Sequence, residues 1–413
     1  MISVPAFLQP LIIALQKRGA SPVLVGGFVR DSLLRVPLKD IDIEVYNIAS
    51  FDMMAEVLNP FGSLNLVGKN FGILKLSFEG YDIDFSLPRV EKKIAIGHKG
   101  FNVLLDAKLS FKKAALRRDF SINAMGYDIN SALLLDPYNG KKDLQNKKLA
   151  YVNETTFIED PLRVLRAVQF CARFELTCSD ELITLCRSIC ESGAIKELPK
   201  ERIFEEFSKL LLKSQKPSIG LSLFETFHLT KYFPEISDKN NLFIHIDAMA
   251  NLKTKDHKRD MILMLSLIVL HFSSTEEVKL FLYKLLNETE IIDKVCNLYM
   301  YRYILSDVAE NSLSNYEILL LSTKTVIEDL LILGKVQGKN FNKIQEKAKQ
   351  LGVLTCKPKP LLYGRDLIAL GLNPSSLFSE ILQAAYDAQL QELFKGAKDA
   401  KIWLKNYVDA LIC

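Results

Sequence analysis

The chain has 413 residues, enough for several packed units, and its 49% hydrophobic and 25% charged residues are ordinary for a globular protein. The formal net charge of +4 excludes nucleic-acid binding by bulk charge, so any such contact needs local clusters of Lys and Arg. The longest apolar run, residues 261–270, is too short to span a bilayer. Lys17 and Arg18 follow the apolar part of the first twenty residues, the reverse of a secretory signal. These features predict a cytoplasmic protein without membrane contact.

The first informative stretch covers residues 24–45. A buried strand at residues 23–25 is followed by Gly26 and Gly27, and residues 28–34 are predicted to form a helix. Two glycines let the backbone turn sharply and approach a bound group closely. The helix start then presents unpaired N–H groups, a favourable place for phosphate, and Arg30 in its first turn adds a cation.

The next predicted strand carries Asp40 and Asp42, which share a face because they are two residues apart. Paired carboxylates beside a phosphate site suit Mg²⁺. A glycine pair alone is usually only a turn, and two alternating aspartates alone are usually an exposed strand face. The combination is much more specific. It resembles the head of the nucleotidyltransferase superfamily, and residues 26–31 (Gly-Gly-Phe-Val-Arg-Asp) are similar to its class II tRNA nucleotidyltransferase and poly(A) polymerase branch.

The resemblance implies that Asp40 and Asp42 hold two Mg²⁺ ions and that Gly26, Gly27 and Arg30 seat a triphosphate. Further elements of the head are predicted from its pattern: a helix over residues 51–58, strands over 64–67, 73–78 and 81–87, a turn over 68–72, and a basic loop over 89–101.

In the strand over residues 81–87, Asp84 matches the third acidic residue of the family. Its implied role is to help deprotonate an RNA 3′-hydroxyl. Asp82 shares its face and is interpreted as an exposed strand residue.

A second matching element is Arg117, Arg118, Asp119 and Asn123. Adjacent arginines before an aspartate could form a plain surface ion pair of little energetic value. The resemblance instead implies sugar and phosphate recognition, with Arg118 and Asp119 contacting the ribose hydroxyls, since an Arg/Asp couple can both donate to and accept from a hydroxyl.

From residue 155 the pattern is helical, and Asp160, Arg163 and Arg166 recur every three residues as neighbours on one face. A simple ion pair is the alternative to a binding role. Adenine and cytosine each place an amino donor beside a ring-nitrogen acceptor, which complements a carboxylate beside a guanidinium, whereas guanine and uracil reverse that pattern. Asp160 and Arg163 also match the base-selecting motif of the family, and residues 200–207 resemble the helix that braces it.

Later segments carry weaker signals. His271 resembles an HD-type phosphohydrolase site, but an HD site needs aspartate next, and Phe272 cannot bind a metal ion. The four cysteines between residues 171 and 190 are interpreted as buried core thiols rather than a metal site. Residues 363–405 resemble the C-terminal pattern of bacterial CCA-adding enzymes. The lysines just upstream could grip an RNA backbone or form a solvated helix face: Lys343, Lys347, Lys349, Lys357 and Lys359.

These observations predict an α+β head of the nucleotidyltransferase type, a mixed sheet with helices, followed by an all-α neck, body and tail. The predicted boundaries are 1–150 for the catalytic head, 151–215 for the base-recognising neck, 216–355 for a body that resembles a degenerate HD-like domain, and 356–413 for a tRNA-binding tail. The resemblance implies template-independent addition of CCA to the tRNA 3′ end from CTP and ATP, with release of pyrophosphate and no stable protein partner. CC addition, A addition and poly(A) synthesis remain alternatives, and a phosphohydrolase or a catalytically silent RNA-binding protein is disfavoured.

Overall fold

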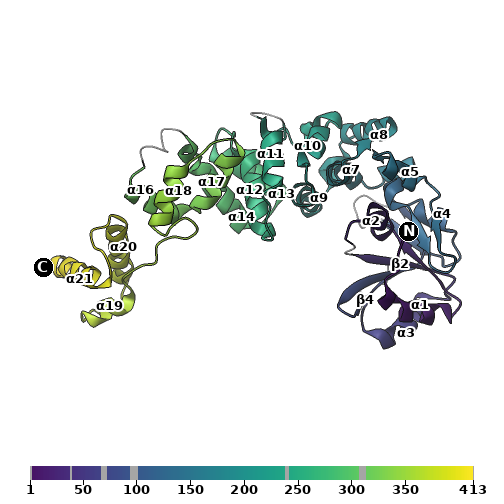
Figure 1. Ribbon diagram of the computed structural model, residues 1–413, viewed down its shortest axis with the longest axis horizontal. Helices are drawn as coiled ribbons and strands as arrows, with labels where there is room; N and C mark the ends of the chain where they lie inside the picture. The colour runs from purple at the N-terminus through teal and green to yellow at the C-terminus, as the bar shows by residue number, and fades with distance from the viewer. Residues whose placement is uncertain are drawn as a thin grey trace. The chain divides into compact units, whose positions relative to one another are not determined.

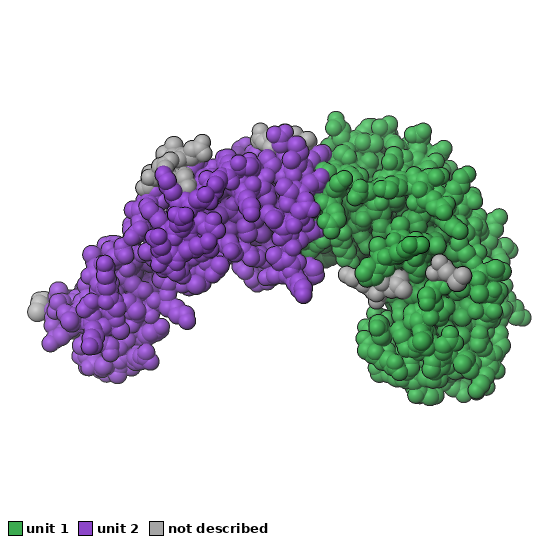
Figure 2. Space-filling view, in the orientation of Figure 1, with its two compact units in different colours: residues 1–238 green, residues 239–413 purple. Residues whose placement is uncertain are grey.

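The computed structural model describes residues 2–37, 40–66, 72–93, 101–237, 241–306 and 313–412. The chain divides into two compact units, Met1–Asp238 and Lys239–Cys413, coloured separately in Figure 2. The first unit contains the sheet and the helices that follow it, and the second is helical (Figure 1). The mixed-sheet head with a helical continuation confirms the predicted fold class. The four finer boundaries predicted from the sequence remain predictions.

Seven of the described strands form one mixed sheet in the order β3-β4-β5-β2-β1-β8-β9. Neighbouring strands are antiparallel except for β2 and β5, which run parallel. Their bounds are Ser21–Val25 for β1, Ile41–Tyr46 for β2, Ser63–Asn65 for β3, Ile73–Phe78 for β4, Tyr81–Ser86 for β5, Gly126–Asp128 for β8 and Leu133–Leu135 for β9.

Of the central strands, β1 is apolar after its first residue and almost wholly buried, whereas β2 and β5 alternate apolar and polar residues. Helices α1 (Gln9–Gln16) and α3 (Phe51–Leu58) pack on each other, and α1 contacts β1 (Figure 1). Phe111, the first residue of α4 (Phe111–Ala115), packs against a cluster of Val23, Val25 and Tyr46. Helix α2 (Gly27–Leu34) follows β1 in the chain and contacts both β1 and β2.

The helix over residues 51–58 and the strand over 73–78 form as predicted, and the strand over 81–87 ends one residue early. The basic loop predicted over residues 89–101 is wrong at both ends. There, β6 (Arg89–Lys93) pairs antiparallel with β7 (Phe101–Leu105). Residues 89–93 form a strand because they pair with residues 101–105, and the composition of residues 89–93 alone does not indicate this partner. Residues 94–100, and most of the turn predicted over 68–72, lie outside the described residues.

The helical part of the first unit is centred on α7 (Leu162–Phe174), which packs against α9 (Lys200–Lys213) and α10 (Pro217–Thr226). Shorter helices precede and follow α7: α5 (Gly140–Gln145), α6 (Glu154–Ile158) and α8 (Asp180–Glu191). Cys171, Cys178, Cys186 and Cys190 are buried, which confirms them as core thiols. The Sγ atoms of Cys171 and Cys178 lie 3.3 Å apart.

The second unit consists of helices that begin with α11. Their bounds are Leu242–Ala250 for α11, His257–Val269 for α12, Thr275–Leu285 for α13, Thr289–Met300 for α14, Asn315–Lys324 for α16, Ile327–Val336 for α17, Asn342–Gln350 for α18, Gly364–Ala369 for α19, Leu377–Leu390 for α20 and Ala397–Ile412 for α21. Phe272 is buried and packs edge-on against Phe281, so it is a core residue. Among the described helices, none combines the length and the apolar character needed to cross a membrane.

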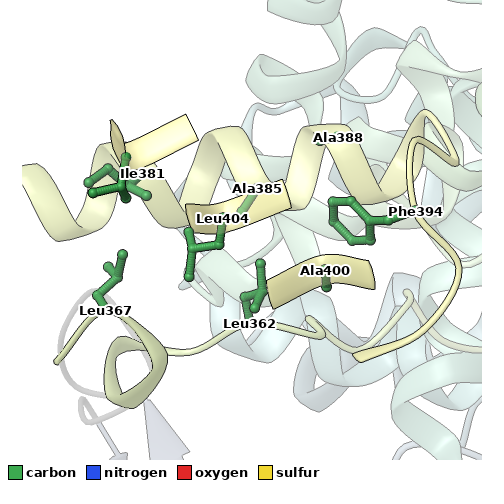
Figure 3. Close-up of a cluster of buried hydrophobic side chains, with 9 residues drawn as sticks. Leu362, Leu367, Ile381, Ala385, Ala388, Phe394, Ala400 and Leu404 are labelled. Atoms are coloured by element: carbon green, nitrogen blue, oxygen red, sulfur yellow. The ribbon is translucent and has the colours of Figure 1, made fainter. Parts of the chain in front are cut away.

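The last three helices have a small core of their own, which contains Leu367, Ile381, Phe394 and Leu404 (Figure 3). Gln389 on α20 secures the segment before α19, because its side chain accepts a hydrogen bond from the Leu361 amide and donates one to the Lys359 carbonyl, both 2.9 Å long. Several residues that resemble the bacterial C-terminal pattern therefore have structural roles.

We predict that Leu404→Ala destabilises the second unit by about 2–5 kcal/mol, because Leu404 is 1% exposed and its removal leaves a cavity. Ile402→Ala on the same helix is the control, since Ile402 is 62% exposed and its loss should change stability by less than about 0.5 kcal/mol. Urea unfolding followed by tryptophan fluorescence measures both, because Trp403 is the single tryptophan and packs on this core. Equal destabilisation by the two variants would contradict the packing.

Candidate active site

A cavity of about 460 Å³ lies within the first unit, where the sheet meets the helices that follow it. Its lining includes most of the site residues predicted from the sequence. The lining residues are Gly26, Gly27, Arg30, Asp42, Arg89, Arg117, Arg118, Asp119, Asn123, Asp160, Leu162, Arg163, Arg166, Phe170 and Arg202. Residues from six separate stretches of the chain thus meet in one place.

The turn between β1 and α2 requires glycine at position 26. Gly26 has a φ of +63°, and a Cβ atom added there would lie 2.8 Å from Nη1 of Arg118. The Gly26 amide donates to the Met125 carbonyl, and the Gly26 carbonyl accepts from the Arg30 amide. The first turn of α2 therefore begins directly at the cavity, and its N–H groups are a favourable place for an anion.

The predicted acidic residues come together from two neighbouring strands. In the parallel register of β2 and β5, Asp42 lies opposite Asp84, so their side chains point to the same face. Asp40 is exposed and directly precedes β2, two residues before Asp42. Asp82 is exposed and accepts a hydrogen bond from Ser77, as expected for a surface strand residue.

The surroundings of Asp42 disfavour its charged form. Burial raises the pKa of Asp42 to about 6, a rise that Arg118 opposes and the carboxylates of Asp84, Asp40 and Glu44 reinforce. Oδ1 of Asp84 is buried and accepts no hydrogen bond from any described residue, although Nζ of Lys75 lies 3.7 Å away. A bound cation would relieve both features.

No group of three or more His, Cys, Asp or Glu side chains in the described part of the chain is arranged to hold a metal ion by itself. The site offers Asp42 and Asp84, with Asp40 nearby. Such a set fits an ion that takes one or two carboxylates from the protein and its other oxygens from phosphates and water, as Mg²⁺ does.

Asp119 is the centre of a buried network. One carboxylate oxygen accepts hydrogen bonds from the Phe120 amide and from Nδ2 of Asn123, and the other pairs with Arg166 at 2.6 Å. Burial alone would raise the pKa of Asp119, but Arg166, Arg163 and these hydrogen bonds lower it to about 2. Asp119 thus lines the cavity while also holding Arg166 in place.

Arg30 links the glycine turn to the neck helix. Its guanidinium pairs with Asp31 at 2.7 Å and donates to Oδ1 of Asn123 at 2.5 Å. The same group lies 5.3 Å from the ring centroid of Phe170 and 4.6 Å from that of Phe174 on α7. These contacts fix the orientation of Arg30 at the cavity.

The base-recognition residues predicted from the sequence also reach the cavity. Asp160 precedes α7, and its carboxylate accepts from the Leu162 amide and pairs with Arg202 at 3.0 Å. Arg163 donates to the Arg117 carbonyl at 2.6 Å, which ties the neck to the head. A carboxylate can accept about four hydrogen bonds, so Asp160 keeps acceptor capacity for a ligand.

Two side chains of α9 brace this region, as the resemblance of residues 200–207 predicted. Arg202 pairs with Asp160, and the buried Glu206 lies 3.7 Å from Arg166. The sequence analysis did not identify either as a site residue, although their spacing of four residues places both on one helix face.

Three further residues of the site were also missed. Arg89 and Phe170 line the cavity, and Glu44 lies behind it. Glu44 continues the alternation of Asp40 and Asp42 on β2, and this periodicity was the one signal that could have identified it. Arg89 and Phe170 have no comparable local signal.

Two family models match the chain. Residues 23–150 match the model described as Poly A polymerase head domain, and residues 184–240 match that described as Probable RNA and SrmB- binding site of polymerase A. The two matches cover the sheet and part of the helical region of the first unit.

Curated relatives match about half of the chain. The Multifunctional CCA protein of Pseudoalteromonas atlantica is 37% identical over 216 residues, which are 52% of this chain and 51% of that protein. The Multifunctional CCA protein of Acinetobacter baylyi is 36% identical over 216 residues, or 52% and 50% of the two chains. The chain thus spans about half the length of the curated relatives it matches.

Solved structures share the fold over nearly the whole chain. The Bacillus stearothermophilus CCA-adding enzyme in complex with CTP has a TM-score of 0.74 at 19% identity and covers 99% of this chain and 100% of its own. The Thermotoga maritima CCA-adding enzyme complexed with tRNA has a TM-score of 0.68 at 21% identity, with 98% and 97% covered.

The sheet, the glycine turn and the paired carboxylates define a nucleotidyltransferase-type head followed by helices. Residues 23–150 and 184–240 are thus similar to regions of poly(A) polymerases, and about half of the chain is similar to proteins named Multifunctional CCA protein.

We predict that Asp119→Asn destabilises the protein on the order of 2 kcal/mol at pH 7, because the lowered pKa of Asp119 records the stabilisation of its charged form. That stabilisation is complete above the unfolded-state pKa of about 4 and is lost as the pH falls towards 2. The difference in unfolding free energy from wild type should therefore stay constant between pH 7 and 5 and narrow below pH 4.

Urea titrations at pH 7, 5, 4 and 3 measure this difference. Asp82→Asn is the matched control, because Asp82 is exposed and its substitution should have little effect at any of these pH values. A difference for Asp119→Asn that is as large at pH 3 as at pH 7 would contradict the role of its charge.

Proposed function

We propose that the protein adds CCA to the 3′ end of tRNA from CTP and ATP without a nucleic-acid template. The observation that carries this proposal is the meeting of Asp42, beside Asp84 on the sheet, with Asp160 and Arg163 in one arginine-rich cavity. The names of the relatives and the shared fold support it: proteins called Multifunctional CCA protein match about half of the chain, and structures of CCA-adding enzymes match nearly the whole fold.

Nucleotide binding would use the groups that surround the cavity. The triphosphate would lie over Gly26 and Gly27 at the start of α2, with Arg30 nearby. The two arginines of the second element, Arg117 and Arg118, would contact the phosphates and ribose. In this assignment Asp119 and Asn123 contribute mainly by orientation, since Asn123 binds both Arg30 and Asp119.

Base choice would depend on Asp160 and Arg163. A carboxylate acceptor beside a guanidinium donor complements the amino group and ring nitrogen of adenine and cytosine but not the reversed edges of guanine and uracil. Arg202 would hold the carboxylate of Asp160, and Arg166 would support the same wall of the cavity from its pairs with Asp119 and Glu206.

The reaction would be an in-line substitution at the α-phosphorus. The RNA 3′-oxygen forms a bond to phosphorus, the bond to the bridging oxygen of the β-phosphate breaks, and pyrophosphate leaves. Asp84, which lies opposite Asp42 in the sheet, would help to accept the proton of the 3′-hydroxyl.

Divalent metal ions belong to this proposal, and we assign them as two Mg²⁺. Asp40 and Asp42 would hold them, and when bound they would stabilise charge on the attacking and leaving oxygens. The raised pKa of Asp42 and the orphaned oxygen of Asp84 support a cation at this place.

The other partner would be the tRNA, recognised mainly by shape and backbone because A-form grooves expose little sequence. In this proposal residues 1–150 catalyse, 151–215 select the base, 216–355 form the body and 356–413 contact tRNA. The lysines upstream of the tail, such as Lys357 and Lys359, would add backbone contacts. We expect the protein to act in the cytoplasm.

The decisive experiment offers the protein tRNAs that lack the last one, two or three 3′ nucleotides, with one nucleoside triphosphate at a time. We expect C to be added to the two shorter acceptors and A to the acceptor that ends in CC. Extension by C alone, by a single A alone, or by a run of A residues would instead identify a CC-adding enzyme, an A-adding enzyme or a poly(A) polymerase.

In the same assay, Asp42→Ala should reduce nucleotide addition to background, because it removes the carboxylate that lies opposite Asp84 in the sheet. Binding of tRNA, measured by gel shift, should be largely retained. Asp82→Ala on the neighbouring strand is the control and should keep activity near that of wild type, since Asp82 is exposed and bonded to Ser77. Turnover that survives in Asp42→Ala would refute the metal role.

A second variant tests base choice. Asp160→Ala removes the acceptor of the proposed base-reading pair, so the preference for A and C over G and U should fall by at least about tenfold. Misincorporation is measured with each of the four nucleoside triphosphates on the acceptor ending in CC. Unchanged selectivity would remove Asp160 from base recognition.

A further inference from the structure

The buried carboxylate of Glu44 has no place in the proposed chemistry. Asp40, just before β2, and Asp42 and Glu44 on β2 alternate in the sequence, and their exposure falls in that order from exposed through half-buried to 0%. The first two residues can meet a ligand, whereas Glu44 is covered by protein. A fully buried acidic side chain is costly unless it is paired, so its partners indicate its role.

The partners of Glu44 lead directly to the cavity. One carboxylate oxygen accepts a hydrogen bond from Nη2 of Arg117 at 3.0 Å, and the other accepts from the Tyr46 hydroxyl at 2.6 Å. The side chain of Arg117 is 17% exposed and lines the cavity. Glu44 therefore contacts from behind a guanidinium that faces the proposed nucleotide site.

Arg118 depends on the same carboxylate electrostatically. Burial lowers the pKa of Arg118, and Glu44 is the strongest of the groups that oppose this shift, ahead of Asp42. Nη1 of Arg118 also donates a hydrogen bond to the Asn123 carbonyl at 3.2 Å. It lies so close to Gly26 that a Cβ atom added at that residue would be 2.8 Å from it. If Glu44 lost its charge, Asp42 would be the main counter-charge left to Arg118.

The charge of the cavity explains why such a group is needed. Its lining holds seven arginines but three acidic residues, Asp42, Asp119 and Asp160. Arg166 is balanced from behind by the buried Glu206, and Arg117 is balanced in the same way by Glu44. Each buried acid offsets the repulsion between neighbouring guanidinium groups and restricts their orientation.

We propose that Glu44 is a positioning residue for nucleotide binding, which fixes Arg117 directly and Arg118 electrostatically so that both guanidinium groups face the triphosphate and ribose. This inference rests on the proposed function for the identity of the ligand. It assigns Glu44 no contact with the nucleotide and no part in proton transfer.

The test measures CTP affinity by isothermal titration without an RNA acceptor, so that no transfer can occur. Glu44→Gln keeps the shape of the side chain but removes its charge, and the dissociation constant for CTP should rise about tenfold or more. In the tRNA extension assay the same variant should raise KM for CTP by a similar factor while kcat changes less. Tyr46→Phe is the matched control: it removes one hydrogen bond but leaves the ion pair with Arg117, so its effect should stay within about threefold.

A double-mutant cycle separates positioning from a general effect on stability. If Glu44 acts through Arg117, Glu44→Gln should weaken CTP binding by a clearly smaller factor in the Arg117→Ala background than in wild type, and the remaining effect is the part that acts through Arg118. Effects that multiply, or a Glu44→Gln affinity within twofold of wild type, would overturn the proposal. Circular dichroism and thermal unfolding check the fold of each variant. Should Glu44→Gln not fold, Glu44→Asp, which retracts the charge by one methylene, must weaken CTP binding in the folded protein.

The two proposals fail in different ways. A wild-type protein that binds CTP but extends no tRNA would refute CCA addition, while the comparison of CTP affinities would still decide the role of Glu44. A wild-type protein that does not bind CTP would overturn the role of Glu44 as well.

Discussion

Repulsion among the arginines of one cavity is the constraint on which the first unit depends. Seven guanidinium groups line a space of about 460 Å³, and they can be held there only if acidic groups offset their charge. The fold supplies these acids from different elements: Glu44 on β2, Asp119 between α4 and β8, and Glu206 on α9. The sheet and the neck helices are consequently joined by ion pairs that also shape the site.

The parallel pairing of β2 with β5 gives the site its acidic side. The other neighbouring strands of this sheet are antiparallel. Parallel strands cannot be joined by a short hairpin, so β2 and β5 are linked by a long connection that is formed by α3, β3 and β4. Its register places Asp42 opposite Asp84. A shift by one residue would turn one of the two carboxylates to the other face of the sheet.

Sequence identity and fold relate this chain to known proteins over different shares of its length. Sequence identity to the curated relatives is confined to about half the chain, whereas the fold is shared with solved CCA-adding enzymes over nearly all of it. A charged, buried site restricts residue identity strongly, because each arginine needs a matched acid. A helical core such as that around Leu404 requires only apolar residues of suitable volume, so its sequence can change while its packing is kept.

The sequence by itself determined the local elements and most of the site. The glycine pair before a helix, the alternation of Asp40 and Asp42, and the helix over residues 51–58 each follow from short-range steric and periodic rules. Only the tertiary structure decided which groups meet: that residues 89–93 form a strand with residues 101–105, that Asp160 pairs with Arg202, and that Glu44 lies beneath Arg117. Such pairings join residues far apart in the chain, and they depend on strand register and helix packing, which no local pattern encodes.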